Sequence, residues 1–141
     1  MILIIGEEKK GMKMQTQLCA ICGWNLKEYY SVGDICPCCN NEYSFDDFLE
    51  KGEILENYCG GDREKLRIMA PELDGVGDEE YVANDIAWRF LRLAWVKNGC
   101  SFRYHKDEGI QKWTIEDAKK QLSVIGYKYD TLFRLAEEII G

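Results

Sequence analysis

The chain has 141 residues, of which 46% are hydrophobic and 30% charged, a composition that excludes a disordered tail and suffices for a packed core. Its formal net charge is −7, and residues 1–60 carry five basic and ten acidic side chains, which makes nucleic acid a poor partner because phosphate binding needs a basic surface. No apolar run approaches the roughly 20 residues that cross a bilayer, so no membrane role is expected.

Residues 1–16 form a tail ahead of the first cysteine. The apolar opening, residues 1–5, is too short and wrongly flanked for a secretory signal, so the expected compartment is the cytoplasm. Residues 6–11 would be encoded by a purine-rich tract that resembles a bacterial ribosome-binding site. We therefore expect translation to start naturally at Met12 or Met14, and an intact mass that begins at Met1 in native cells would contradict this.

Residues 17–61 are rich in cysteine and turn residues, and they contain two pairs with the same spacing: Cys19 with Cys22, and Cys36 with Cys39. Seven cysteines, an odd number, argue against a disulfide framework and for metal ligation by thiolates in a reducing compartment. Each pair is followed by a residue that tolerates a left-handed backbone, Gly23 or Asn40, and predicts a zinc knuckle in which both thiolates face one ion. The thirteen residues between the pairs suffice for a return strand. The prediction is a structural Zn²⁺ bound by all four cysteines.

Three alternatives to this zinc site stay open at the level of the sequence. Cys38 is close enough in the chain to replace Cys36 or Cys39 as a ligand. Iron also binds tetrahedral sites of four sulfurs, although nothing else in the chain indicates electron transfer. A redox-active dithiol normally lies at a helix start in a βαβ unit, whereas these cysteines lie among turn residues. Cys59 and Cys100 lack nearby partners and are interpreted as buried apolar side chains.

No catalytic role is expected for the ion or for the thiols. A catalytic zinc keeps an open position and often has histidine ligands, and the chain has one histidine, His105. Residues 101–105 are predicted to be extended, which would place Cys100 and His105 on opposite faces and prevent them from acting as nucleophile and base. The chain is therefore not expected to be an enzyme.

Residues 62–141 are predicted to be helical. Asp62 is expected to cap a helix over residues 63–70, and a strongly apolar helix over residues 79–97 is expected to be central. Two further helices are expected to begin at a capping box led by Thr114 and at an N-cap, Asp130. The predicted fold is α+β: a small N-terminal zinc ribbon of short antiparallel strands, packed on a C-terminal region of three or four helices.

Acidic residues gather in two segments, residues 42–56 and 72–85, which together carry twelve acids and one lysine. The simpler interpretation is a pair of solvated surface segments, and the more specific one is a docking face for a basic protein. The candidate contact residues are Asp46, Asp47, Glu50, Glu53, Glu72, Asp74, Glu79 and Glu80.

The motif Cys36-Pro37-Cys38-Cys39 resembles the bacterial cysteine-rich CPCC family, whose name it spells. The resemblance covers about residues 17–50 and 85–125. It includes an aromatic-acidic stretch at 42–47, a tryptophan-containing helix that ends at Gly99, and a later Trp113 and Gln121-Leu122. The chain departs from the family at Asn40, where glycine is usual, and at Ala20-Ile21, where proline is common.

The resemblance implies a poorly characterised protein without an established enzyme activity, of a kind often proposed to be immunity proteins encoded beside polymorphic toxins. Combined with the acidity and the zinc site, it predicts a zinc-stabilised protein-binding module. Such a module would neutralise a cognate toxin by occlusion, with a basic nuclease domain as the natural partner. The alternatives are a ribosome- or nucleic-acid-associated zinc ribbon and a scaffold domain.

Overall fold

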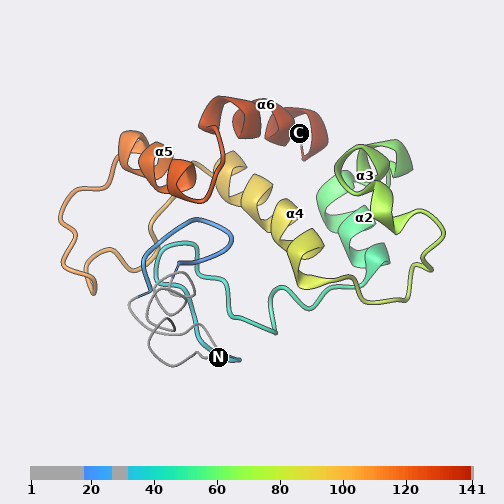
Figure 1. The fold of residues 1–141 in the computed structure, drawn as a ribbon, viewed down its shortest axis with the longest axis horizontal. Helices are drawn as coiled ribbons and strands as arrows, with labels where there is room; N and C mark the ends of the chain where they lie inside the picture. Colours follow the sequence, from blue (N-terminus) through green and yellow to red (C-terminus); the bar gives the residue numbers. More distant parts are fainter. Residues whose placement is uncertain (1–17, 27–31, 141) are drawn as a thin grey trace, which may run out of the picture.

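The computed structural model describes residues 18–26 and 32–140, and the described part is helical (Figure 1). The elements are α2 (Lys51–Cys59), α3 (Arg63–Met69), the short 3-10 helix η1 (Pro71–Leu73), α4 (Asn84–Lys97), α5 (Ile115–Val124) and α6 (Tyr129–Ile139). None of the described helices is long and apolar enough to cross a membrane. The predicted tail, residues 1–16, and its candidate start codons lie outside the described residues.

The prediction of an α+β fold with a zinc ribbon is wrong for the described residues, which contain no β-strand and no sheet. Three isolated antiparallel bridges take their place: Leu18 with Asn25, Ile35 with Glu42, and Glu50 with Tyr81. The physical reason is local. Each cysteine pair is enclosed by one tight turn that a single bridge closes, so no ladder extends from it. The predicted C-terminal helical region is present.

Two of the three predicted capping residues lie at the start of a helix, and the third does not. The Asp62 side chain accepts hydrogen bonds from the N–H groups of Glu64 and Lys65 and caps α3, which ends just before Pro71. Thr114 forms the expected capping box with Asp117 at the start of α5. The last helix begins at Tyr129, with Lys128 rather than Asp130 at the N-cap position.

Three segments differ from the prediction. Helix α4 starts at Asn84 instead of residue 79, because Val82 N–H donates to Leu49 C=O and Tyr81 pairs with Glu50. Residues 51–59, expected within the zinc module, form α2, whose start is a capping box between Glu50 and Glu53. The extended piece predicted over residues 101–105 is absent, because a turn begins at residue 103 and continues to residue 109.

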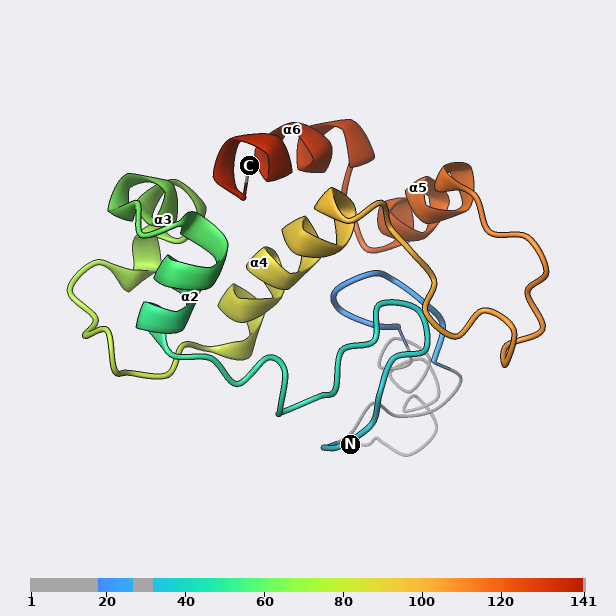
Figure 2. The same cartoon turned by 180° about the vertical axis from the view of Figure 1, so that it is seen from behind.

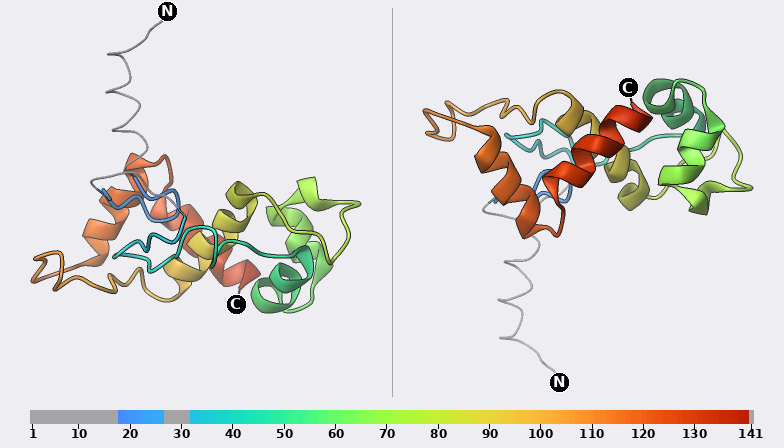
Figure 3. Two further views of the ribbon diagram at one scale, coloured as in Figure 1. Left: turned by 90° about the horizontal axis from the view of Figure 1, so that it is seen from below. Right: turned by 90° about the horizontal axis from the view of Figure 1, so that it is seen from above.

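Helix α4 is the centre of the fold, as its wide apolar surface predicted. Its buried residues include Ala87, Phe90 and Leu93, none of which is exposed to solvent. Helix α6 packs along one side of α4, and the cysteine-bearing loops lie on the other side (Figures 2 and 3). The loops are therefore attached to the most buried helix of the molecule.

Candidate metal centre

The first cysteine turn, residues 18–25, folds back on itself around Cys19 and Cys22. Gly23 N–H donates to Cys19 C=O at 2.8 Å, and Cys19 N–H donates to Trp24 C=O at 2.9 Å. The bridge between Leu18 and Asn25 closes the turn. These bonds hold both thiols of the pair on the inside of the turn.

The second cysteine turn, residues 35–42, repeats this geometry position by position. Asn40 N–H donates to Cys36 C=O at 2.8 Å, and Cys36 N–H donates to Asn41 C=O at 3.0 Å. The bridge between Ile35 and Glu42 closes it, as the bridge between residues 18 and 25 closes the first turn. The two turns are therefore equivalent, with residue 36 at the position of residue 19.

The residue after each pair has a left-handed backbone, as the sequence predicted: φ is 87° at Gly23 and 68° at Asn40. Glycine adopts this conformation without steric cost, and asparagine tolerates it better than most residues. Gly23 has a second constraint, because a Cβ atom there would lie 2.4 Å from the Gln121 carbonyl oxygen. Helix α5 thus packs directly on the backbone of the first turn.

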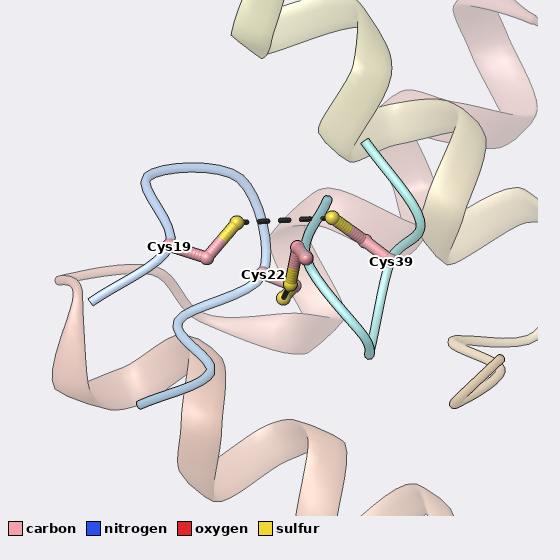
Figure 4. A group of neighbouring side chains, drawn as sticks. Cys19, Cys22 and Cys39 are labelled. Atoms are coloured by element: carbon pink, nitrogen blue, oxygen red, sulfur yellow. Dashed lines mark hydrogen bonds between the residues drawn. The ribbon is translucent and has the colours of Figure 1, made fainter. Parts of the chain in front are cut away.

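The two turns bring four sulfur atoms together, those of Cys19, Cys22, Cys36 and Cys39, all within 4.8 Å of one another. Figure 4 labels three of these residues, Cys19, Cys22 and Cys39. Cys19 Sγ lies 3.7 Å from Cys39 Sγ, and Cys22 Sγ lies 3.6 Å from Cys36 Sγ. A tetrahedral ion with bonds to sulfur of about 2.3 Å has edges of about 3.8 Å, whereas a disulfide is about 2.05 Å long. The thiols are free, and their spacing fits one tetrahedral metal ion.

Cys38 is not a member of this cluster. It holds the place in the second turn that Ile21 holds in the first, and both side chains are buried. Its sulfur accepts a hydrogen bond of 3.4 Å from Gln121 Nε2. The geometry therefore favours Cys36 and Cys39 as the ligands from the second turn, which is the choice that the spacing predicted.

The thiols of the cluster perturb one another. Hydrogen bonding from Cys22 lowers the pKa of Cys19, whereas burial raises the pKa of Cys22 and hydrogen bonding with Cys19 raises the pKa of Cys39. One thiolate at Cys19 is thus stabilised by its neighbours, and further ionisation is opposed. A bound cation would remove this opposition, because it allows all four sulfurs to be ionised together.

Arg92 of α4 supports the first cysteine turn. Its Nε donates to Ile21 C=O at 2.9 Å and its Nη2 donates to Ala20 C=O, while the Tyr127 ring covers the guanidinium at 4.0 Å. Burial lowers the pKa of Arg92, and the nearby Cys19 and Cys22 oppose that effect. Arginine is rarely fully buried unless it is paired, yet only 4% of Arg92 is exposed.

The second cysteine turn has its equivalent carbonyls bound in another way. Arg103 N–H donates to Cys38 C=O and Tyr104 N–H donates to Pro37 C=O, both at 2.9 Å. Backbone groups of residues 103 and 104 thus do for the second turn what one guanidinium does for the first. Gln121 of α5 adds a bond to the first turn, from Nε2 to Cys22 C=O at 2.9 Å.

The eight acidic residues predicted to contact a partner differ in their exposure and in their ion pairs. Asp47 is fully buried, so the prediction that it contacts a partner is wrong: its carboxylate accepts from Ser44 N–H at 2.7 Å and from Trp88 Nε1 at 2.8 Å. Glu72 and Asp74 are exposed but form ion pairs with Arg89 and Arg67. Asp46, Glu53, Glu79 and Glu80 are exposed, and Glu50 is half-buried at the start of α2.

The remaining cysteines and the histidine lie apart from the cluster. Cys59 and Cys100 are buried, as predicted, and burial raises their pKa values to about 11 and about 12. These thiols are protonated at neutral pH and lack nucleophilic character. His105 Nδ1 lies 3.0 Å from Ile110 C=O and thus closes its own loop.

Comparison with known proteins gives no match to a family model, a curated protein or a solved structure.

Proposed function

We propose that the cysteine cluster binds one Zn²⁺ with a structural role. The observation that carries this is the meeting of two equivalent turns, which place four sulfurs within 4.8 Å of one another, with the Cys19–Cys39 and Cys22–Cys36 pairs at 3.7 and 3.6 Å, close to the edge of a tetrahedral four-sulfur site. Three of the four cysteines are fully buried. Four sulfur ligands would fill every position of a tetrahedral ion and leave none for substrate or water, which is typical of a structural site.

We prefer zinc to iron because of the residues that the chain offers around the cluster. Both metals accept four thiolates in a tetrahedron. The chain offers no second cluster of metal ligands among the described residues that would pass electrons onward. Free thiols and a thiolate-bound metal also suit a reducing compartment such as the cytoplasm.

The zinc would stabilise a module that binds a basic protein partner. The net charge of −7 supports this, and four thiolates around one Zn²⁺ would add about −2. Acidic inhibitors use such a charge to steer basic proteins toward them. Together with the resemblance to the cysteine-rich CPCC family, the charge supports an immunity protein that neutralises a bacterial toxin by occluding a basic domain.

The test is a pull-down from the native host with the tagged chain, with metal analysis of the same preparation. The proposal expects one zinc per chain and recovery of a basic toxin domain that is lost when the cluster is disrupted by Cys22→Ser. Recovery of ribosomal or transcription components in place of a toxin would overturn the immunity role in favour of a nucleic-acid-associated module.

A further inference from the structure

Three large aromatic side chains are exposed where the loop before α2 meets the loop before α4. Phe45, Phe48 and Tyr81 are 60%, 53% and 53% exposed. The rings of Phe48 and Tyr81 stack on each other with centroids 4.0 Å apart and planes 4° apart. Exposed apolar surface of this kind marks sites of protein interaction.

These rings are held in place by the backbone beneath them. The bridge between Glu50 and Tyr81 joins the two loops, which run side by side in Figure 1. Lys51 N–H donates to Glu80 C=O at 2.9 Å, and Val82 N–H donates to Leu49 C=O at 2.9 Å. A partner that binds here would meet a preformed surface and would lose little free energy in ordering it.

The buried Asp47 fixes the other end of the same loop. It ties the turn around Ser44 to Trp88 of α4, and Phe48 N–H donates to Phe45 C=O at 3.3 Å within that turn. The acid predicted to be a contact residue is thus a positioning residue for the exposed rings on either side of it.

The two segments that carry the rings have charge of one sign. Residues 42–50 and 79–85 contain no lysine or arginine. The adjoining Lys51 turns inward, where its Nζ donates to Leu73 C=O at 2.9 Å and to Val76 C=O at 2.6 Å. The acids beside the rings are Asp46, Glu50, Glu53, Glu79 and Glu80. We name these acids, together with Phe45, Phe48 and Tyr81, the aromatic-acidic face.

We infer that the aromatic-acidic face docks an arginine-bearing segment of a basic protein partner. A guanidinium stacks on aromatic rings and donates to carboxylates at the same time, so it matches both parts of the face. Aromatic residues in the middle of a charged rim are also where binding energy concentrates in interfaces. This inference rests on the proposed protein-binding function and assigns a surface to it.

The test uses the zinc-loaded full chain and a fluorescent peptide that alternates arginine with glycine, compared with its lysine counterpart. We expect saturable binding that is tighter for the arginine peptide, with NMR shift changes confined to residues 45–53 and 79–82. Replacing both exposed rings, Phe48→Ser with Tyr81→Ser, is expected to weaken binding about tenfold. The charge reversal Glu79→Lys is expected to weaken it too. The matched control is Phe133→Ser, which removes an exposed ring on α6.

Equal affinity of the double variant and the wild type would overturn the inference, as would shift changes on another surface or an absence of peptide binding by the zinc-loaded chain. The same variants separate this inference from the proposed function. Equal recovery of a toxin domain by the wild type and the double variant would contradict the role of the aromatic-acidic face and leave the proposed binding function in place. A wild type that lacks zinc or recovers no partner would remove the function itself. Thermal unfolding of each variant shows that the exposed substitutions leave the fold intact.

Discussion

The two cysteine turns share one backbone geometry but are fastened to the helices by different groups. In the first turn the carbonyls of Ala20 and Ile21 are bound by the side chain of Arg92. In the second turn the matching carbonyls, of Pro37 and Cys38, are bound by backbone N–H groups of residues 103 and 104. Equal local structure therefore does not imply equal sensitivity to mutation. Replacing the Arg92 side chain removes the donors of both carbonyls in the first turn, whereas the matching carbonyls of the second turn keep their backbone donors whichever side chain is replaced.

The largest effect is expected where the turns are alike, at the metal ligands. Cys22→Ser in the first turn and Cys36→Ser in the second each remove one of four ligands, so both should abolish stoichiometric zinc. The loss of a structural zinc removes on the order of 10 kcal/mol of apparent binding free energy, so both variants should also lose solubility and unfold at lower temperature. Metal analysis and thermal unfolding measure this. Cys38→Ser is the control and should keep one zinc per chain, and a fully stable, zinc-free Cys22→Ser protein would refute the structural role.

The second-largest effect on stability is expected to differ between the two turns. Arg92→Leu would remove two hydrogen bonds from a charged donor and leave buried carbonyls unpaired, so we expect a loss of about 3 to 5 kcal/mol in the free energy of unfolding. Zinc should also pass to a competing chelator faster. Arg103→Leu is the matched variant for the second turn and should cost less than about 0.5 kcal/mol, because it keeps the backbone N–H that makes the bond. Chemical denaturation and chelator kinetics test this pair, and equal losses would contradict the comparison.

The left-handed positions should also respond unequally. At Gly23 an added Cβ meets both a positive φ and the Gln121 backbone, so Gly23→Ala should cost about 2 to 3 kcal/mol. Asn40 has the same backbone conformation and already carries a Cβ atom. Asn40→Ala should therefore cost about 1 kcal/mol, and Asn40→Gly should be close to neutral. Denaturant titration would show the order, and a Gly23→Ala protein no less stable than Asn40→Ala would contradict the packing of α5 on the first turn.

The smallest effect is expected at the ion pair between Arg89, which is half-buried on α4, and the exposed Glu72. Hydrogen bonds from Arg89 lower the pKa of Glu72 from 4.5 to about 2. A carboxyl with a lowered pKa stabilises the fold above its ordinary pKa, and this contribution is lost as the pH falls from about 4.5 to about 2. Glu72→Gln should lower the melting temperature slightly at pH 7, and its difference from the wild type should narrow below pH 4.5. A difference in melting temperature that stays constant with pH would show that the ion pair between Glu72 and Arg89 adds nothing to stability. Glu79→Gln is the exposed control.

The local parts of the site could be predicted from the sequence. The spacing of the cysteines and the left-handed positions after them are properties of short turns, so the choice of Cys36 and Cys39 over Cys38 agrees with the structure. The groups that hold the turns could not be predicted, because Arg92 lies 71 residues along the chain from Ile21, whose buried carbonyl it binds. An arginine on a helix that is apolar around most of its circumference was the available signal, since most of such a helix is buried.

The missing strands have a local origin, whereas the early start of α4 and the exposed Asp47 were predicted wrongly because of distant pairing. Strands were expected between the cysteine pairs, but each turn is closed by one bridge and attached to the helices instead. The start of α4 was placed too early because the pairing of Tyr81 with Glu50, across 31 residues, cannot be seen in local propensity. Asp47 was expected on the surface because an acid in a turn is normally solvated, whereas Trp88 provides it with a buried donor.

The most direct test of the metal centre is X-ray absorption spectroscopy at the zinc edge, on the wild-type chain and on Cys38→Ser. The account predicts four sulfur neighbours at about 2.3 Å in both proteins. A shell that contains nitrogen or oxygen, or one that loses a sulfur in the Cys38→Ser protein, would contradict a closed centre built from Cys19, Cys22, Cys36 and Cys39.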